Sequence, residues 1–187
     1  MLNRLSRPRP ILALLAVLAI AALILLSFGR PVICTCGTIS LWGHVGPEQS
    51  QMIADWYSPS HIVHGFLFYG LLHLIARRWP VERRFLVALV IEAAWELLEN
   101  TPLIIDRYRE ATIALGYSGD SILNSLSDIL MLAIGFWAAR RFPFWVSVVI
   151  VLLLELIPLI AIRDNLTLNV LMLAAPSDAI RAWQGAA

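Results

Sequence analysis

The chain has 187 residues, of which 59% are hydrophobic and 14% charged, with a net charge of +1 and a mean hydropathy of +0.77. The apolar share of a soluble domain is nearer to about 45–50%, so this composition excludes an ordinary soluble globular domain. We expect an all-α integral membrane protein that forms one membrane domain over residues 1–187, a bundle of about five transmembrane helices.

The first spanning helix is predicted at residues 11–28, an apolar run preceded by Arg4, Arg7 and Arg9. A positive flank before an apolar run is also typical of a secretory signal peptide. This run is long for a signal peptide, however, and no small-x-small cleavage site follows it. We therefore expect the helix to be retained.

Residues 30–60 are expected to form an outer loop that contains a short amphipathic helix over 48–57. Cys34 and Cys36 lie in this loop, on the oxidising side of the membrane. A disulfide between residues two apart would be strained, because their Cα spacing approaches the upper limit of disulfide geometry. A redox pair, a ligand pair with His44 and inert packing all remain open.

Four more spanning helices are predicted from apolar runs that end at arginine, asparagine or proline residues. They cover about 61–76, 85–99, 121–139 and 144–162. Residues 100–120 form a second outer loop, in part helical. The last apolar stretch, 166–175, is shorter than the roughly 20 residues that a spanning helix needs, so we expect a re-entrant or interfacial segment there.

Arginine positions set the predicted orientation, because cytoplasmic loops are enriched in arginine and lysine. With the N-terminus inside, the inner loops contain a single acid, Glu82, and the arginines Arg4, Arg7, Arg9, Arg77, Arg78, Arg83, Arg84, Arg140 and Arg141. The outer arginines are diluted by acids. The prediction is a multi-pass protein of the bacterial inner membrane, with a cytoplasmic N-terminus and a periplasmic C-terminus.

Three glutamates on one predicted helix lie at membrane depth. Glu92, Glu96 and Glu99 follow one another at i, i+4 and i+7, so they share one stripe of the helix. With a rise of about 1.5 Å per residue they lie about 12 to 22 Å into a core about 30 Å thick. A charged side chain at the bilayer centre costs about 2.5–3.5 kcal/mol, so these groups require partners or a function.

The neighbouring helices bring polar groups to the same outer half of the membrane. His61 and His64 lie in the first turn of one helix, and Asp128 lies on a later one. We predict a polar pocket, although a network that only holds the helices together would use the same residues. The candidate catalytic residues, acting as acid, base or ligand, are His61, His64, Glu96, Glu99 and Asp128.

Two ligand hypotheses follow from these side chains. Imidazole and carboxylate are good ligands for zinc or iron, so a divalent metal could bind His61, His64 and Glu96, although an HxxH spacing alone is weak evidence. Arginines near the outer headgroups could bind phosphate by bidentate contacts, or could pair with neighbouring acids instead. The candidate substrate-binding residues are Arg107, Arg109, Asp120, Asn124 and Arg163.

The stretches HIVHGFLFYG, IEAAWELLEN, RYREATIALGYSGDSILNSLSD and IRDNLTLNVLML resemble a bacterial membrane-protein family of unknown function (domain of unknown function 2585, uncharacterised protein family 0314). The resemblance runs from about Cys34 to Trp183 and implies a multi-pass inner-membrane protein without an assigned activity. The order of a histidine, then Glu96, Asp120, Asn124 and Gly135 more loosely resembles VanZ-like proteins, although Pro59-Ser60 replaces their Asp-Lys. That likeness suggests cell-envelope biology.

Three functions compete at this point. The first is binding or modification of a lipid-linked or amphiphilic envelope substrate in the outer-leaflet pocket. The second is a proton- or ion-coupled transporter, which Glu92 and Glu155 favour because intramembrane carboxylates form relays. The third is a non-catalytic assembly partner. The expected partners are the bilayer and a lipid-linked small molecule, with no nucleic acid.

Overall fold

The computed structural model describes residues 10–46, 48–112 and 116–185, so Arg4, Arg7 and Arg9 lie outside the described residues. Over these ranges the chain is helical without a strand, as predicted. The helices are α1 (Pro10–Ser27), α2 (Ser58–Ile75), α3 (Val81–Glu99), α4 (Pro102–Ala111), α5 (Ile122–Arg141), α6 (Phe144–Ile162), α7 (Leu166–Ala174) and α8 (Asp178–Gly185).

Three of the described helices, α1, α5 and α6, are long and apolar enough to cross a membrane. Helices α2 and α3 are of similar length, 18 and 19 residues. Their sequences are more polar, because α2 contains three histidines and α3 contains charged residues at both ends and in its middle. Association with a membrane is therefore indicated, whereas five crossings are not established.

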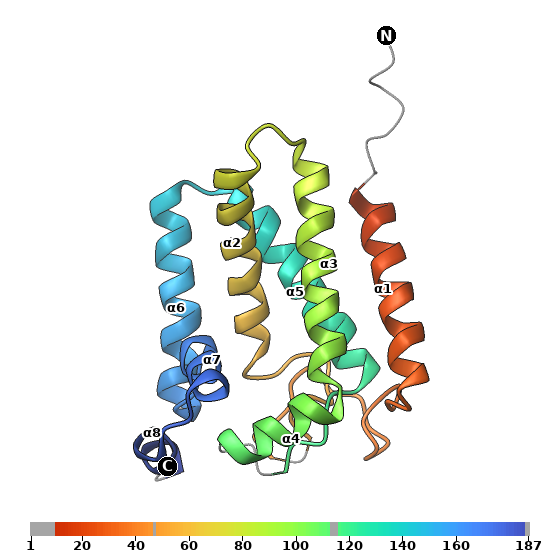
Figure 1. Cartoon of the computed structure of the whole chain (residues 1–187), viewed down its shortest axis with the longest axis vertical. Helices are drawn as coiled ribbons and strands as arrows, with labels where there is room; N and C mark the ends of the chain where they lie inside the picture. The colour runs from red at the N-terminus through yellow and green to blue at the C-terminus, as the bar shows by residue number, and fades with distance from the viewer. Residues whose placement is uncertain (1–9, 47, 113–115, 186–187) are drawn as a thin grey trace.

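The long helices run along one direction, with α1, α3, α2 and α6 in a row and α5 behind them (Figure 1). The turns that join α2 to α3 and α5 to α6 lie at one end of the bundle, which we call the arginine end because Arg77, Arg78, Arg140 and Arg141 flank these turns. The loop from 28 to 57, α4, α7 and α8 lie at the opposite end.

Helices α2 and α5 make the closest contact in the bundle. A Cβ atom at Gly65 would lie 2.3 Å from the Leu132 carbonyl oxygen, and one at Gly135 would lie 2.1 Å from that of Ile62. Only glycine allows the two backbones to approach this closely. The contact places the first turn of α2 against the first half of α5.

An apolar core fills the bundle between this contact and the arginine end. Phe85 and Leu89 of α3 pack with Leu132 and Phe136 of α5, and all four side chains are at most 1% exposed. Burial of such side chains contributes about 1.5–3 kcal/mol each. The core closes the arginine end with apolar side chains.

Helix α1 packs on α3 through one stripe of its surface. Val17, Ala21 and Leu25 recur every four residues and are buried, whereas most of the other α1 side chains are exposed. Just after α1, Arg30 donates to the carbonyl oxygens of Ser118 and Asp120 at 2.7 to 3.0 Å. This first helix is therefore joined to the segment that begins α5.

The loop before α2 contains no helix over 48–57, so the prediction of a short amphipathic helix there is wrong. These residues contain turns, bends and an isolated β-bridge between Ala54 and Trp42, and Ser50 has a φ of 63°. The Asp55 carboxylate accepts from the backbone N–H groups of Ser50, Tyr57 and Ser58, an alternative to helical hydrogen bonds. Cys34 and Cys36 form a disulfide with a Cα spacing of 5.1 Å, inside the ordinary range rather than at its limit.

The residues predicted as a re-entrant or interfacial segment form the nine-residue helix α7. At about 1.5 Å per residue it is about 13 Å long, too short to span a bilayer. The Asn165 side chain caps it by accepting from Leu168, and Glu155 of α6 accepts from the Leu166 and Thr167 N–H groups. Glu155 therefore anchors α7 to α6.

Candidate functional site

A cavity of about 250 Å³ lies in the half of the bundle away from the arginine end. Its apolar wall comes from α2, α3 and α7 and includes Phe68, Ile91, Trp95, Leu166 and Val170. Its polar lining includes Asp55, His61, His64, Glu92, Glu96, Glu99, Tyr108, Asp120, Asn124 and Asp128. The cavity thus combines a polar region with an apolar one.

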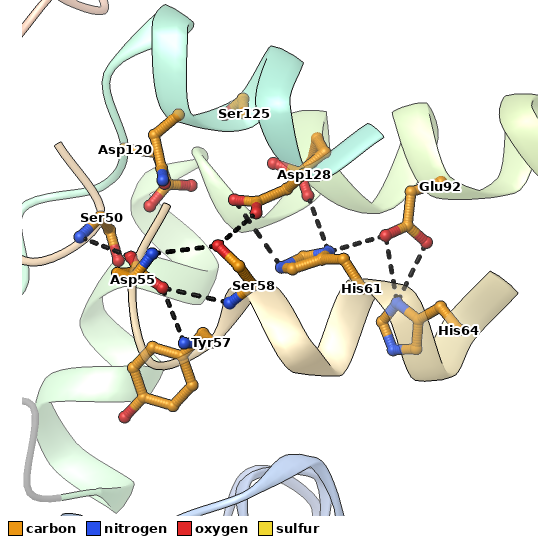
Figure 2. A network of polar contacts seen from close by, with 12 residues as sticks. Ser50, Asp55, Tyr57, Ser58, His61, His64, Glu92, Asp120, Ser125 and Asp128 are labelled. Carbon is orange, nitrogen blue, oxygen red and sulfur yellow. Dashed lines mark hydrogen bonds and ion pairs between the residues drawn. The ribbon is translucent and has the colours of Figure 1, made fainter. Parts of the chain in front are cut away.

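His61 lies at the centre of the polar lining and connects three helices (Figure 2). Its Nδ1 lies 2.7 Å from Glu92 Oε1 of α3, and its Nε2 lies 3.8 Å from Asp128 Oδ2 of α5. The first distance is a hydrogen bond and the second is too long for one. His61 is only 7% exposed, so these carboxylates rather than water are the main polar groups around its ring.

Glu92 joins the two histidines. Its carboxylate also lies 3.0 and 3.1 Å from Nδ1 of His64, and its exposed fraction is 0%. An ionised carboxylate only accepts hydrogen bonds, so it selects the tautomer with a hydrogen on Nδ1 for both imidazoles. The Nε2 atoms of His61 and His64 then keep their lone pairs, as a base or a metal ligand requires.

Asp128 is connected to the loop before α2. Ser58 Oγ donates to Asp128 Oδ1 at 3.3 Å, and the Asp55 N–H donates to Ser58 Oγ at 3.0 Å. Figure 2 shows this chain running from Ser50 through Asp55 and Ser58 to Asp128. The loop therefore fixes both the first residue of α2 and a carboxylate of the cavity.

Glu96 has a buried oxygen that no described group satisfies. Its Oε1 accepts no hydrogen bond and lies 3.4 Å from Nδ1 of His61, which already donates to Glu92. A buried acceptor without a partner costs about 1–3 kcal/mol, and more if it is charged. This oxygen is therefore an unsatisfied acceptor, which a proton, a ligand or a cation would satisfy.

Asp120 and Asn124 occupy the end of the cavity near α4. Asp120 accepts from Tyr117 Oη at 2.9 Å and from Asn100 Nδ2 at 2.8 Å, while burial raises its pKa to about 6. Burial also raises the pKa of Tyr117 and of Tyr108. Asn124 Nδ2 donates to the Met52 carbonyl oxygen at 2.9 Å, which anchors the loop to α5.

The three arginines predicted to bind substrate do not line the cavity. Arg107 donates to the Leu173 carbonyl oxygen, and Arg163 donates to that of Trp183. Arg109 donates to the Tyr117 carbonyl oxygen and lies 3.7 Å from Asp106, a pairing that the sequence also suggested. These guanidinium groups tie α4, α7 and α8 to their neighbours.

The structure brings the other predicted residues together, since His61, His64, Glu96, Glu99, Asp120, Asn124 and Asp128 line one cavity. Glu92 contacts both histidines but is not among the predicted site residues. Its spacing from Glu96, four residues on the same stripe of the helix, is the sequence signal that could have identified it. Asp55 and Ser58 gave no signal in the sequence, because their contacts depend on how the loop folds back.

Carboxylates dominate the cavity's electrostatics. Six acidic side chains line it, namely Asp55, Glu92, Glu96, Glu99, Asp120 and Asp128. Among the described residues, the basic groups of its lining are His61 and His64, and no arginine lines it. Three overlapping sets bring possible metal ligands within 4.8 Å of one another: His61, His64 and Glu92; His61, Glu96 and Asp128; Glu96, Glu99 and Asp120.

Comparisons with known proteins place the chain among relatives of similar length. The family described as "Protein of unknown function (DUF2585)" matches residues 25–186. A UPF0314 protein of Rhizobium johnstonii is 56% identical over 175 residues, covering 92% of this chain and 90% of that one. One from Sphingopyxis alaskensis is 56% identical over 176 residues (90% and 91% covered), and one from Paracoccus denitrificans is 50% identical over 182 residues (96% and 94% covered). These matches do not support the likeness to VanZ-like proteins, and no solved structure matches significantly.

Proposed function

This chain belongs to the DUF2585 family, and from its cavity we propose that it is a multi-pass inner-membrane protein that binds the polar headgroup of an amphiphilic cell-envelope molecule. His61, Glu96 and Asp128 are the residues that we propose act on that headgroup, as acid, base or ligand. The location of the cavity, the exposure of its wall and the charge of its lining support this proposal.

The observation that carries the proposal is a polar lining that is buried and an apolar wall that reaches the surface. Glu92 and Glu96 are at most 1% exposed, whereas Ile91 and Val170 are 44% and 55% exposed. The cavity therefore opens between α2, α3 and α7 beside apolar helix surfaces. In a membrane this opening faces acyl chains, so a ligand with a polar head and an apolar tail fits it.

The charge of the lining restricts the headgroup. An anionic phosphate would face carboxylates and no arginine, which like-charge repulsion disfavours. A hydroxyl-rich or amine-bearing headgroup suits these acceptors, because carboxylates accept hydrogen bonds from hydroxyl and ammonium groups. The proposed substrate class is accordingly a lipid-linked sugar or amine.

The proposed topology has five crossings, by α1, α2, α3, α5 and α6, with the N-terminus in the cytoplasm and the C-terminus in the periplasm. The apolar length of α1, α5 and α6 supports it, as does the collection of arginines at one end of the bundle. In this orientation the cavity lies in the outer half of the membrane.

Proton-coupled transport is the alternative that one observation favours. Contacts lead from Glu92 through His61 and Asp128 to Ser58, toward the loop end of the bundle. On the other side, however, Phe85, Leu89, Leu132 and Phe136 separate Glu92 from the arginine end with apolar side chains. A relay would need polar groups or water there, so binding fits the bundle better than conduction.

Native mass spectrometry of the protein released from lipid nanodiscs tests the proposal. We expect the wild type to retain an amphiphile that is enriched over the bulk lipids. Val170→Trp fills the mouth of the cavity and should lose it, whereas Val149→Trp on α6, with the same 55% exposure, should keep it. No enriched ligand in the wild type, or equal retention by both variants, would contradict the proposal.

A deletion strain connects this binding to the cell envelope. Its lipids and cell wall should change, and wild-type protein should restore them whereas His61→Asn should not. If His61→Asn reaches the membrane at normal levels and melts normally, the loss comes from the site. If His61→Asn restores the strain fully, His61 has no role in the chemistry of the site. If it fails only because the protein unfolds, the result favours the assembly role.

A further inference from the structure

The contacts around Nε2 of His61 differ from an ordinary hydrogen-bond network. Nε2 lies 3.8 Å from Asp128 Oδ2, beyond hydrogen-bond distance, and the two atoms face each other. Two ligands that each lie about 2.1 Å from one metal ion are separated by about 3.0 to 4.2 Å, depending on the angle between them. The separation therefore fits two ligands of a shared ion.

Glu96 supplies a third ligand and an independent sign of a missing partner. His61, Glu96 and Asp128 each offer a ligand atom within 4.8 Å of the others, and all three residues are buried. Glu96 is 1% exposed, yet its Oε1 accepts no hydrogen bond from the described residues. A cation between Glu96 and Asp128 would satisfy this oxygen and offset the repulsion of the two carboxylates.

Glu92 completes the arrangement from behind the imidazole. A histidine that ligates a metal usually donates its other N–H to a carboxylate, which fixes the tautomer and the ring orientation. The 2.7 Å contact from His61 Nδ1 to Glu92 supplies this partner. The other candidate ligand set around Glu92 consists of His61 and His64. The Glu92 carboxylate already lies within hydrogen-bond distance of Nδ1 of both histidines, so this set needs no ion.

We propose that the cavity binds one divalent first-row transition-metal ion, of the zinc or manganese type, through His61, Glu96 and Asp128. Glu92 is a positioning residue for His61 in this site. A mixed nitrogen and oxygen ligand set suits these ions and disfavours calcium and magnesium, which prefer oxygen ligands alone. The ion leaves coordination positions toward the cavity open, where a headgroup hydroxyl or a water can bind and become more acidic.

The site is tested by a calorimetric titration with zinc. The full-length protein in detergent is first treated with a chelator to remove bound metal. We expect one zinc ion per wild-type chain and a higher Tm on zinc addition, because a ligand that binds only the folded state stabilises it. Asp128→Asn and Glu96→Gln should each lose at least tenfold in affinity. Glu92→Gln should lose about 10–100-fold while keeping the stoichiometry, as expected for a partner behind the ligand.

Two histidine variants serve as matched controls. His64→Asn removes the imidazole that the proposed ion does not use, and His44→Asn removes an exposed one. His44→Asn should keep wild-type affinity, whereas His64→Asn should lose less affinity than Glu92→Gln, because it removes only a partner of Glu92. The visible spectrum of bound cobalt should change in Glu92→Gln, whereas a merely structural role of Glu92 would leave it unchanged. Circular dichroism and size-exclusion chromatography verify that each variant is folded, and Glu96→Gln provides the test if Asp128→Asn does not fold.

Three outcomes overturn the assignment: no stoichiometric zinc in the wild type, binding that His44→Asn abolishes, or binding that His64→Asn abolishes while Asp128→Asn keeps it. The metal site stands on its own geometry and does not rest on the proposed amphiphile. Retention of the amphiphile by metal-free protein would leave the proposed function intact if the zinc titration fails. Zinc binding without an enriched amphiphile would leave the metal site intact.

Discussion

Gly65 and Gly135 lie so close together that the backbones of α2 and α5 leave no room for a Cβ atom at either position. His61 lies one turn before Gly65, and Asp128 lies about two turns before Gly135. The close contact of the two helices therefore sets the distance between the imidazole and the carboxylate. Two residues without side chains thus determine the geometry of the site.

Gly65→Ala should destabilise the protein, because the added Cβ would lie 2.3 to 2.7 Å from backbone atoms of α5, which cannot move as a flexible side chain would. Overpacking of this kind typically costs about 1–3 kcal/mol. Gly70→Ala is the matched control in the same helix, since nothing lies within 4 Å of its Cβ position. There we expect no loss, or a gain of up to about 1 kcal/mol. Equal melting temperatures of the two variants in detergent would refute the close contact.

Glu96 and Asp128 should be coupled in a thermal-stability double-mutant cycle. Both carboxylates lie within 4 Å of His61, so loss of one changes what the other has to satisfy. We expect Glu96→Gln and Asp128→Asn to be sub-additive, with an interaction energy of about 0.5–3 kcal/mol. Glu96→Gln should simply add to Glu82→Gln, which lies in the first turn of α3 at the arginine end. An additive Glu96–Asp128 cycle would mean that the two carboxylates do not share one site.

The pH dependence of stability should report on Asp164, which lies between α6 and α7. Burial raises its pKa above the ordinary 3.8, although Tyr57 Oη donates to its Oδ2 at 2.9 Å. The folded state then binds the proton more tightly, so the free energy of unfolding falls as the pH rises from about 4 through the raised pKa. Asp164→Asn should remove this fall and gain stability relative to the wild type with increasing pH. Asp178→Asn, at a fully exposed side chain, should leave the pH profile of the melting temperature unchanged.

Reporter fusions test the orientation. A reporter that is active only in the periplasm should be silent after Arg84 or Arg141 and active after Gly116 or at the C-terminus. Arg84 and Arg141 lie in α3 and α5 beside the arginine-end turns, whereas the start of α5 and the last described helix, α8, lie at the opposite end of the bundle. Activity after Arg84 would reverse the proposed orientation. A silent C-terminal fusion would require another crossing after α6, which the nine residues of α7 are too short to provide.

Apolar runs and charge placement were enough to predict the helical class and the gathering of α2, α3 and α5 side chains around one cavity. They act locally, through the period of the helix and the cost of burying charge. Glu92 and Glu96 lie on one stripe of the predicted helix, so the spacing already indicated that both could reach His61. Glu92 was predicted nearer the middle of the membrane, however, and that position favoured a separate role in a proton relay.

The sequence did not predict what depends on contacts between distant segments. The loop before α2 reads as amphipathic by its pattern, yet the Asp55 carboxylate takes its backbone N–H groups. Arg107 and Arg163 read as headgroup ligands by their location, yet carbonyl oxygens of α7 and α8 accept from them. Tertiary hydrogen bonds of this kind have no periodic signature in the sequence.

The attachment of α1 has a consequence for biogenesis. Arg30 hydrogen-bonds the Asp120 carbonyl oxygen, 90 residues later in the chain. At a synthesis rate of about 5–20 residues per second, the ribosome needs about 5–18 s to make that partner. For the earlier part of this interval, until Val81–Glu99 has been made, Val17, Ala21 and Leu25 have no α3 to pack against. The packing of α1 is therefore completed late in synthesis, by segments that follow it at a distance in the chain, so α1 is made well before the surface that it covers.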